Sequence, residues 1–233
     1  MNGRSVGIVR AFYGEIDTVR RVTTIRLVKR RQRRVPRIIL ASASPRRAEL
    51  LQEMGVKVEI IPTRAAEIEG GHLDPLELAL TNACRKAVVV SDLHPDALVI
   101  GADTVVTLGG RCFGKPADNR AAARMLRALS GKTHEVITGV CLMRKSARDL
   151  EVFAEISRVQ LRRLTSRTIS DYLAKVDVLD KAGAYAIQEH GEMLVKGLAG
   201  SFSNVVGLPV ERLQAALSSR GLPCGARHSH RAR

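Results

Sequence analysis

A short apolar run that leads directly into a helix start constrains the fold of this chain more than any other feature. Residues 38–47 read I-I-L-A-S-A-S-P-R-R, and the first three suit a buried strand. Ser44 followed by Pro45 is the usual pairing of an N-cap with a first helical residue, and Gly55 is a typical helix end. We therefore expect a strand followed by a helix over residues 45–54.

The start of this helix indicates an anion-binding site. Its first backbone NH groups lack partners within the helix and lie at the positive end of the helix dipole. Arg46 and Arg47 lie in the first turn, where an exposed cation is disfavoured by about 0.3–1 kcal/mol. An anion bound there would offset this cost, and phosphate is the best candidate. A capped helix with two solvated arginines is the alternative.

The charge of the chain is concentrated at its two ends. The formal net charge is +15, but residues 1–37 hold 11 of the 38 Lys/Arg residues and only two acids, and residues 218–233 hold four arginines and no acid. The nearly neutral body argues against a fold that grips nucleic acid by itself. We expect residues 1–36 and 218–233 to be disordered basic extensions of a domain over residues 37–217.

The N-terminal extension has three interpretations. Its run K-R-R-Q-R-R at residues 29–34 could lack a folded role, contact nucleic acid or a membrane surface, or belong to an organelle-targeting segment. No apolar run is long enough to span a membrane, and nothing resembles a secretory signal. The four cysteines show neither zinc nor disulfide spacing. We expect a cytoplasmic protein that does not enter a membrane.

The pattern of apolar runs and turn residues predicts an α/β fold. Further strands are expected at residues 56–61, 97–100, 105–108, 111–113, 135–143, 150–164 and 193–195, and helices at residues 75–90, 118–129, 170–176 and 208–217. The two long strands in the middle of the chain favour an antiparallel pair. We expect a mixed, partly antiparallel sheet with helices packed on it, in two lobes with a cleft between them.

Asp103 is the main catalytic candidate. It follows the apolar residues 98–100, so we expect it at the carboxyl end of a buried strand, where open α/β sheets bind ligands. A carboxylate there is costly to leave unpaired, so it is neutralised by Arg or Lys, bound to a metal, used as a base, or employed as a cap. Glu67 follows the second strand and could supply a second carboxylate for a divalent cation, although a solvated loop residue is the alternative.

Two further segments carry candidate ligands. Residues 109–115 match the spacing of a Walker A loop, but Pro116 replaces the required Ser/Thr, so no P-loop is expected. Lys115 remains a candidate phosphate ligand, with an exposed turn lysine as the alternative. Residues 180–188 read D-K-A-G-A-Y-A-I-Q, and the amide of Gln188 offers the donor and acceptor that a pyrimidine edge requires. A structural glutamine is the alternative.

Several motifs occur in an order that resembles one known family. L-A-S-A-S-P-R-R, I-G-A-D-T-V-V, G-K-P, L-S-G-K-T-H-E-V-I-T-G-V, D-K-A-G-A-Y-A-I-Q and S-F-S-N-V-V-G-L-P follow one another between residues 37 and 217. This arrangement resembles the Maf family of nucleoside triphosphate pyrophosphatases. The resemblance implies a Maf/ITPase-like fold and hydrolysis of a nucleoside triphosphate to the nucleoside monophosphate and pyrophosphate.

The resemblance also implies roles for the candidate residues. Asp103 would orient or deprotonate the attacking water. Phosphate binding falls to Ser42, Arg46, Arg47 and Lys115. Glu67 and Asp103 would engage Mg²⁺ or Mn²⁺.

Three positions point to a substrate class within the family. Arg46, Thr104 and Gln188 match the dTTP/UTP-cleaving subgroup, which favours a pyrimidine substrate and a house-cleaning role in the nucleotide pool. A subgroup that cleaves 7-methyl-GTP would carry an acidic residue in place of Gln188. Ala66 stands where many relatives have an acid, and Ala186 replaces a common glycine. These departures put metal affinity and the width of the base pocket in question.

A hypothesis from another class is a non-catalytic protein connected with cell division, whose basic tails contact nucleic acid. It predicts that deleting residues 1–35 destroys function and that Asp103→Asn does not. The sequence leaves open whether the chain forms a homodimer.

Overall fold

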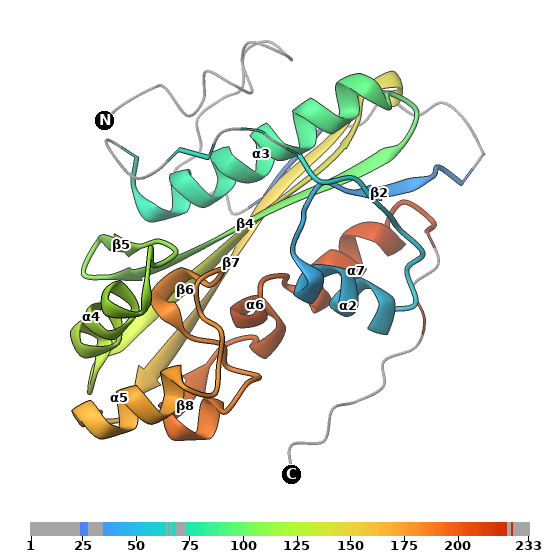
Figure 1. The fold of residues 1–233 in the computed structure, drawn as a ribbon. Helices are drawn as coiled ribbons and strands as arrows, with labels where there is room; N and C mark the ends of the chain where they lie inside the picture. Colours follow the sequence, from blue (N-terminus) through green and yellow to red (C-terminus); the bar gives the residue numbers. More distant parts are fainter. Residues whose placement is uncertain are drawn as a thin grey trace.

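The computed structural model describes residues 24–27, 35–63, 65, 67–68, 73–222 and 225, in which eight strands form one sheet (Figure 1). The strands are β1 (Thr24–Leu27), β2 (Ile38–Leu40), β3 (Glu59–Ile60), β4 (Leu98–Leu108), β5 (Arg111–Phe113), β6 (Thr133–Arg144), β7 (Asp149–Leu161) and β8 (Val195–Ala199). Their order is β1-β7-β6-β4-β2-β3, with β5 on β4 and β8 on β7. β2 runs parallel to β3 and β4, and the other pairs are antiparallel. The expected mixed sheet is confirmed.

Helices cover both faces of this sheet. They are α2 (Pro45–Glu53), α3 (Pro75–Leu93), α4 (Asn119–Leu129), α5 (Ser166–Leu173), α6 (Phe202–Val206) and α7 (Val210–Ser218), with 3-10 turns at Lys145–Ala147, Ala182–Ala184 and Gly191–Met193. α3 lies along one face, whereas α2 and α7 lie beside α6 at one end of the long strands and α4 and α5 at the other end (Figure 1). No helix in the described ranges is long and apolar enough to cross a membrane.

Residues along β4 contribute to three separate apolar clusters. Val99 joins the apolar cluster under α3, whereas its neighbour Ile100 joins the cluster under α2 and α7. Further along the same strand, Val106 belongs to the cluster under α4 and α5. The long strands therefore pass along two apolar cores on one face of the sheet, and these two cores form the two lobes that the sequence predicts.

The edge of β4 is open between these two lobes. β6 pairs with one edge of β4 from Val99 to Thr107. On the other edge, the β2 pairing reaches Ile100 and the β5 pairing begins only at Val106. Among the described strands, none pairs with residues 101–105 on that edge. Side chains from both faces of the sheet can therefore reach the same space.

β4 differs from the sequence prediction because it does not end before Asp103. Gly101 and Asp103 were expected to follow a short strand, but β4 continues through them to Leu108. Continuous pairing with β6 stabilises this stretch, and Asp103 lies opposite Gly139. A Cβ at Gly101 would lie 2.2 Å from Ala83 O, and one at Gly139 would lie 2.5 Å from Ala79 O. The two glycines thus allow α3 to approach the sheet closely above Asp103.

Other boundaries differ for local reasons. The strand expected at residues 56–61 is reduced to β3, and the strand expected at residues 193–195 is replaced by a 3-10 turn and β8. α5 begins at Ser166, four residues before the prediction, because the Thr165 side chain accepts a hydrogen bond from Thr168 N and caps the helix. The Gly109–Gly110 hairpin between β4 and β5 is confirmed, and both glycines have positive φ.

Both ends of the predicted domain differ from expectation within the described ranges. Thr24–Leu27 lie in the segment expected to be disordered, yet they form β1 and pair antiparallel with β7. The remainder of residues 1–34 and most of residues 223–233 lie outside the described ranges. Arg220 also lies beyond the expected boundary, but it donates to Asp149 at 2.7 and 2.8 Å and to Glu151 at 2.6 Å. This buried ion cluster attaches the end of α7 to β7.

Candidate active site

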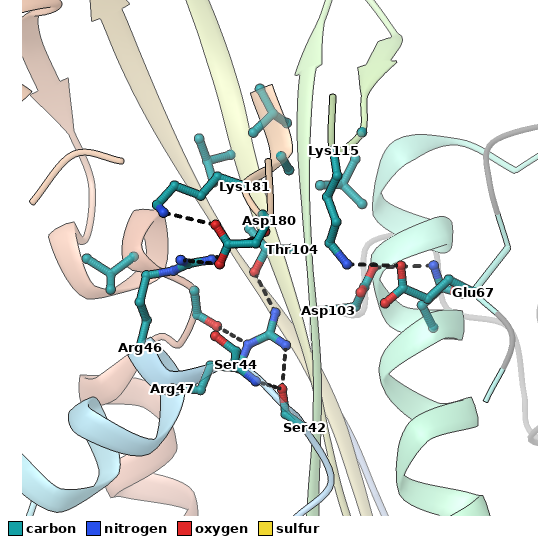
Figure 2. A pocket seen from close by; sticks show the side chains of 18 of the residues that line it. Ser42, Ser44, Arg46, Arg47, Glu67, Asp103, Thr104, Lys115, Asp180 and Lys181 are labelled. Carbon is teal, nitrogen blue, oxygen red and sulfur yellow. Dashed lines mark hydrogen bonds and ion pairs between the residues drawn. The ribbon is translucent and has the colours of Figure 1, made fainter. Parts of the chain in front are cut away.

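A pocket of about 780 Å³ opens at the unpaired edge of β4 (Figure 2). One lobe contributes the β2–α2 connection, and the other contributes the segment after β5 and the loop before β8. All the candidate residues from the sequence line this pocket, namely Ser42, Arg46, Arg47, Glu67, Asp103, Thr104, Lys115 and Gln188. The fold thus brings together side chains from five separate stretches of the chain.

Arg47 is a buried anchor of the pocket wall. Its Nε donates to Gly207 O at 2.9 Å, its Nη1 to Ser42 Oγ at 3.1 Å and its Nη2 to Thr104 Oγ1 at 3.0 Å. Burial lowers the pKa of the guanidinium from its ordinary value, while the negative charge of Asp103 opposes this shift. Arg47 therefore brings a fixed positive charge to the start of α2 and ties that start to β4.

Arg46 behaves differently from its neighbour, although both were predicted to bind phosphate. Its Nη1 donates to Asp180 Oδ2 at 2.8 Å, and Asp180 is half exposed (Figure 2). Partial burial acts to raise the pKa of Asp180, but hydrogen bonds and charge from Lys181 and Arg46 outweigh it and lower the pKa. This ion pair links the two lobes across the pocket mouth.

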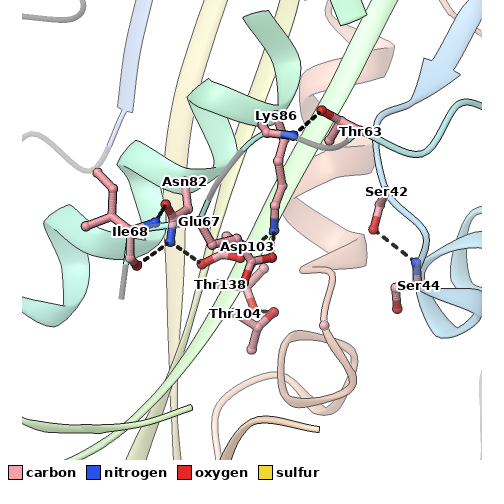
Figure 3. Close-up of polar contacts among 12 residues, drawn as sticks. Ser42, Ser44, Thr63, Glu67, Ile68, Asn82, Lys86, Asp103, Thr104 and Thr138 are labelled. Atoms are coloured by element: carbon pink, nitrogen blue, oxygen red, sulfur yellow. Dashed lines mark hydrogen bonds and ion pairs between the residues drawn. The ribbon is translucent and has the colours of Figure 1, made fainter. Parts of the chain in front are cut away.

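Asp103 lies on the α3 face of the sheet, where two residues of α3 hold its carboxylate (Figure 3). Lys86 Nζ donates to Asp103 Oδ1 at 2.7 Å, and Asn82 Nδ2 donates to Asp103 Oδ2 at 3.3 Å. Asn82 and Lys86 are four residues apart, so they lie on the same side of the helix. All three side chains are buried, and the lysine charge offsets the cost of burying the carboxylate.

Glu67 forms the second acidic position. Its Oε1 lies 2.8 Å from Lys86 Nζ, and its Oε2 lies 3.7 Å from Lys115 Nζ. Partial burial acts to raise the pKa of Glu67, but Lys86, Lys115 and Arg47 together outweigh it and hold the pKa below its ordinary value. Lys86 thus bridges Glu67 and Asp103, and the two carboxylates share one ammonium group.

The two carboxylates have the donor chemistry that Mg²⁺ and Mn²⁺ require. Hard divalent cations take oxygen ligands, and Mg²⁺ is usually held by one or two carboxylates together with phosphate oxygens and waters. Within the described ranges, no group of three or more acidic, His or Cys side chains could hold a metal ion. Glu67 and Asp103 supply carboxylate oxygens of the kind that such a cation takes, and Lys86 lies between them. Ala66 lies outside the described residues.

The rim of the pocket carries the loop before β8. Gln188 is exposed at this rim, and the buried Ala186 also lines the pocket. Thr104 exchanges a hydrogen bond of 3.0 Å with Thr138 on β6, in addition to its bond from Arg47. The pocket therefore combines cationic side chains with an amide and small side chains.

Residues 37–220 match the family described as Maf-like protein. The chain belongs to the Maf family. It is 46% identical over 187 residues to the dTTP/UTP pyrophosphatase of Akkermansia muciniphila, covering 80% of this chain and 98% of that protein. It is 45% identical over 184 residues to the dTTP/UTP pyrophosphatase of Pelotomaculum thermopropionicum, covering 79% and 96%. A solved Ham1 protein from Staphylococcus aureus matches 79% of the chain and 99% of its own length, at 15% identity and a TM-score of 0.47.

Two residues of this Maf-family site were missed by the sequence prediction. Asn82 and Lys86 belong to the helix that was read only for its apolar periodicity, and a lysine on a helix is usually exposed. A usable signal exists in the sequence, because Leu78, Asn82 and Lys86 recur every four residues beside the alanines at 79, 83 and 87. Polar side chains in register with a buried helical face require a buried partner, and here the partner is Asp103.

Proposed function

We propose that this Maf-family chain hydrolyses dTTP and UTP between the α and β phosphates and releases the nucleoside monophosphate and pyrophosphate. The observation that carries the proposal is one pocket that joins the buried carboxylate of Asp103 to several cationic side chains. Those cations are Arg46, Arg47, Lys86, Lys115 and Lys181. The names of the relatives from Akkermansia muciniphila and Pelotomaculum thermopropionicum support the nucleotide class.

Phosphate binding falls to the cationic end of the pocket. Arg47 and Ser42 fix the start of α2, whose dipole and free NH groups favour an anion. Arg46 is available for a phosphate because its exposed ion pair with Asp180 is worth at most about 1 kcal/mol. Lys115 reaches the pocket from the opposite lobe. Positive groups on both sides stabilise the charge that develops on the departing pyrophosphate.

Asp103 orients the attacking water and accepts its proton. Lys86 and Asn82 each occupy one oxygen of its carboxylate, which fixes the plane of the group while lone pairs remain for a water. A positioned general base contributes a rate factor of roughly 100 to 10,000. The buried setting strengthens these electrostatic interactions because little solvent screens them.

Glu67 and Asp103 are the residues that would hold Mg²⁺ or Mn²⁺. The cation, when bound, neutralises charge on the phosphate oxygens and lowers the barrier to attack. Lys86 lies between the same two carboxylates and offsets their negative charge.

Base selection falls to the other end of the pocket. Gln188 carries an amide whose oxygen accepts and whose nitrogen donates, which matches the adjacent NH and carbonyl of uracil or thymine. Thr104 shapes the floor through its bonds to Arg47 and Thr138. We further propose a house-cleaning role in the cytoplasm. The free thiols of Cys84, Cys112 and Cys141 suit a reducing compartment.

Product analysis tests this proposal. Full-length protein with Mg²⁺ is incubated with dTTP, UTP, CTP and 7-methyl-GTP, and pyrophosphate and inorganic phosphate are measured separately. We expect pyrophosphate from dTTP and UTP, with a matched EDTA reaction as the control. Release of inorganic phosphate would reject the reaction, and faster cleavage of 7-methyl-GTP would reject the substrate. No cleavage of any nucleotide would favour a non-catalytic protein.

A further inference from the structure

The loop that carries Gln188 has an unusual backbone. Gly183 and Ala184 both have positive φ, at +74° and +60°, and this region is rarely adopted by residues other than glycine. Gly183 N also donates to Gly114 O at 3.2 Å, beside Lys115. A loop in such a conformation persists only where its surroundings fix it, so the contacts behind the loop decide how Gln188 is presented.

Tyr172 of α5 holds this loop from behind at a single residue. Its hydroxyl accepts a hydrogen bond from Ala186 N at 2.9 Å and donates one to Ala186 O at 3.3 Å. Tyr172 is fully buried, and Ala186 is 4% exposed. Without the phenol, the buried N–H of Ala186 would lose this acceptor, and an unpaired buried group is costly. One phenol therefore fixes both polar groups of one pocket residue.

Ala186 is also the first residue of the turn that presents Gln188. Glu189 N donates to Ala186 O at 3.4 Å, which closes a turn with Ile187 and Gln188 in its two central positions. The carbonyl that closes the turn is the same one that Tyr172 binds. Displacing Ala186 would thus move the turn, and the amide of Gln188 would move with it.

A second buried pair fixes the preceding residue. Tyr185 lines the pocket, and its hydroxyl lies 2.8 Å from Nε2 of His134 on β6. The two rings pack edge to face, with centroids 5.5 Å apart. His134 is 1% exposed. The loop is therefore attached to α5 through Ala186 and to the sheet through Tyr185.

We propose that Tyr172 is a positioning residue for base selection, which acts through Ala186 to set the place of the Gln188 amide. The inference rests on the proposed function, because it concerns the base of the same nucleotide. It assigns Tyr172 no contact with the substrate. Its hydrogen bonds to Ala186 hold the turn with Ile187 and Gln188 in one orientation relative to α5.

The test is Tyr172→Phe, which removes the hydroxyl and keeps the buried ring. We expect the KM for dTTP and UTP to rise about threefold to tenfold, as loss of a buried hydrogen bond implies, while kcat stays within about twofold because the reacting groups are untouched. The preference for UTP over CTP, measured as the ratio of kcat/KM values, should fall. Hydrogen exchange of the Ala186 amide should accelerate.

Ser91→Ala is the matched control. Ser91 is equally buried, and its hydroxyl donates to Val88 O at 3.1 Å, but it lies on α3 outside the pocket lining. This variant should lower stability without changing KM or base preference. If Tyr172→Phe fails to fold, hydrogen exchange of the wild-type protein supplies the test. The Ala186 amide, which donates to the Tyr172 hydroxyl, should exchange slowly, and exchange as fast as that of an exposed loop amide would overturn the positioning role.

The outcomes separate the two claims. A wild-type enzyme that releases pyrophosphate, together with a Tyr172→Phe variant of unchanged KM and base preference, overturns the positioning role and leaves the proposed function standing. The same holds if Ser91→Ala changes these quantities as much as Tyr172→Phe. A wild-type protein that releases no pyrophosphate overturns the proposed function itself.

Discussion

At the scale of single residues, the pocket lining includes the buried cations Arg47, Lys86 and Lys181, and the charges of the first two are compensated in different ways. Arg47 uses Nε, Nη1 and Nη2 for three uncharged oxygen acceptors, so its positive charge is not cancelled within the wall. Lys86 instead lies between two carboxylates, so its positive charge is neutralised within the site. A polyanionic ligand would therefore be attracted towards Arg47. Lys86 instead neutralises part of the charge on Glu67 and Asp103.

His134 provides a prediction at this scale. Burial lowers its pKa to about 4, whereas a histidine in an unfolded chain has a pKa near 6.5. Between these pH values the histidine is protonated in the unfolded chain and neutral in the folded chain. Stability should therefore fall as the pH is lowered from about 6.5 to 4, by up to about 3 kcal/mol from this residue. Urea unfolding of wild type and His134→Gln at several pH values measures the difference.

The comparison between the two proteins isolates the histidine, because carboxylates titrate in both. The free energy of unfolding of His134→Gln should depend less steeply on pH in this window. If the two curves run parallel, His134 does not exclude the proton and the buried Tyr185 contact is not as described.

The residue scale also shows what the sequence could and could not predict about the site. Strand and helix-start patterns were enough to name Arg46, Arg47 and Asp103, because the arginines lie in the first turn of an expected helix and Asp103 comes soon after an apolar run. Ser42 was named only through the resemblance to the Maf family. Lys86 was not predicted, since its role depends on where α3 lies over β4. That placement is decided by contacts between residues far apart in the chain.

At the scale of elements, the close approach of α3 to the sheet controls the geometry of the acidic groups. Gly101 and Gly139 remove the side chains that would separate the helix from β4 and β6. The sequence signalled an interruption of the strand at Gly101, because glycine weakens isolated strands. Here it marks a close backbone approach instead, which explains why β4 was predicted too short.

Gly101→Ala tests this packing. Its Cβ would lie 2.2 Å from Ala83 O, a backbone atom of α3, so the helix must move. We expect the free energy of unfolding to drop by at least about 2 kcal/mol, and kcat/KM to fall because Lys86 and Asn82 move with the helix.

Gly197→Ala on β8 is the matched control, since nothing lies within 4 Å of the added Cβ. It should change stability by no more than about 0.5 kcal/mol. Denaturant titration and steady-state kinetics measure both variants. Equal behaviour of the two alanine variants would contradict the role given to Gly101.

At the scale of the whole molecule, the site exists because β2 and β5 share one edge of β4 and leave a gap between them. The sequence predicted the mixed sheet and the two lobes, but it could not predict this gap, because strand pairing depends on long-range contacts. β1 was likewise missed: a basic segment near the N-terminus predicted disorder, whereas its Thr24–Leu27 stretch pairs with β7. The strand order of the sheet thus brings residues from separate motifs together in one pocket.

The proposed reaction depends on Asp103, which would drive hydrolysis of a nucleotide held by cations from both lobes. The direct measurement is the rate of pyrophosphate release from UTP by wild type, Asp103→Asn and the control Asp92→Asn, whose surface carboxylate pairs with Lys145. Asp103→Asn should lose a factor of roughly 100 to 10,000 in kcat, while it still binds UTP, and Asp92→Asn should match wild type. An Asp103→Asn enzyme that retains wild-type kcat would contradict the role of Asp103 as the base in hydrolysis.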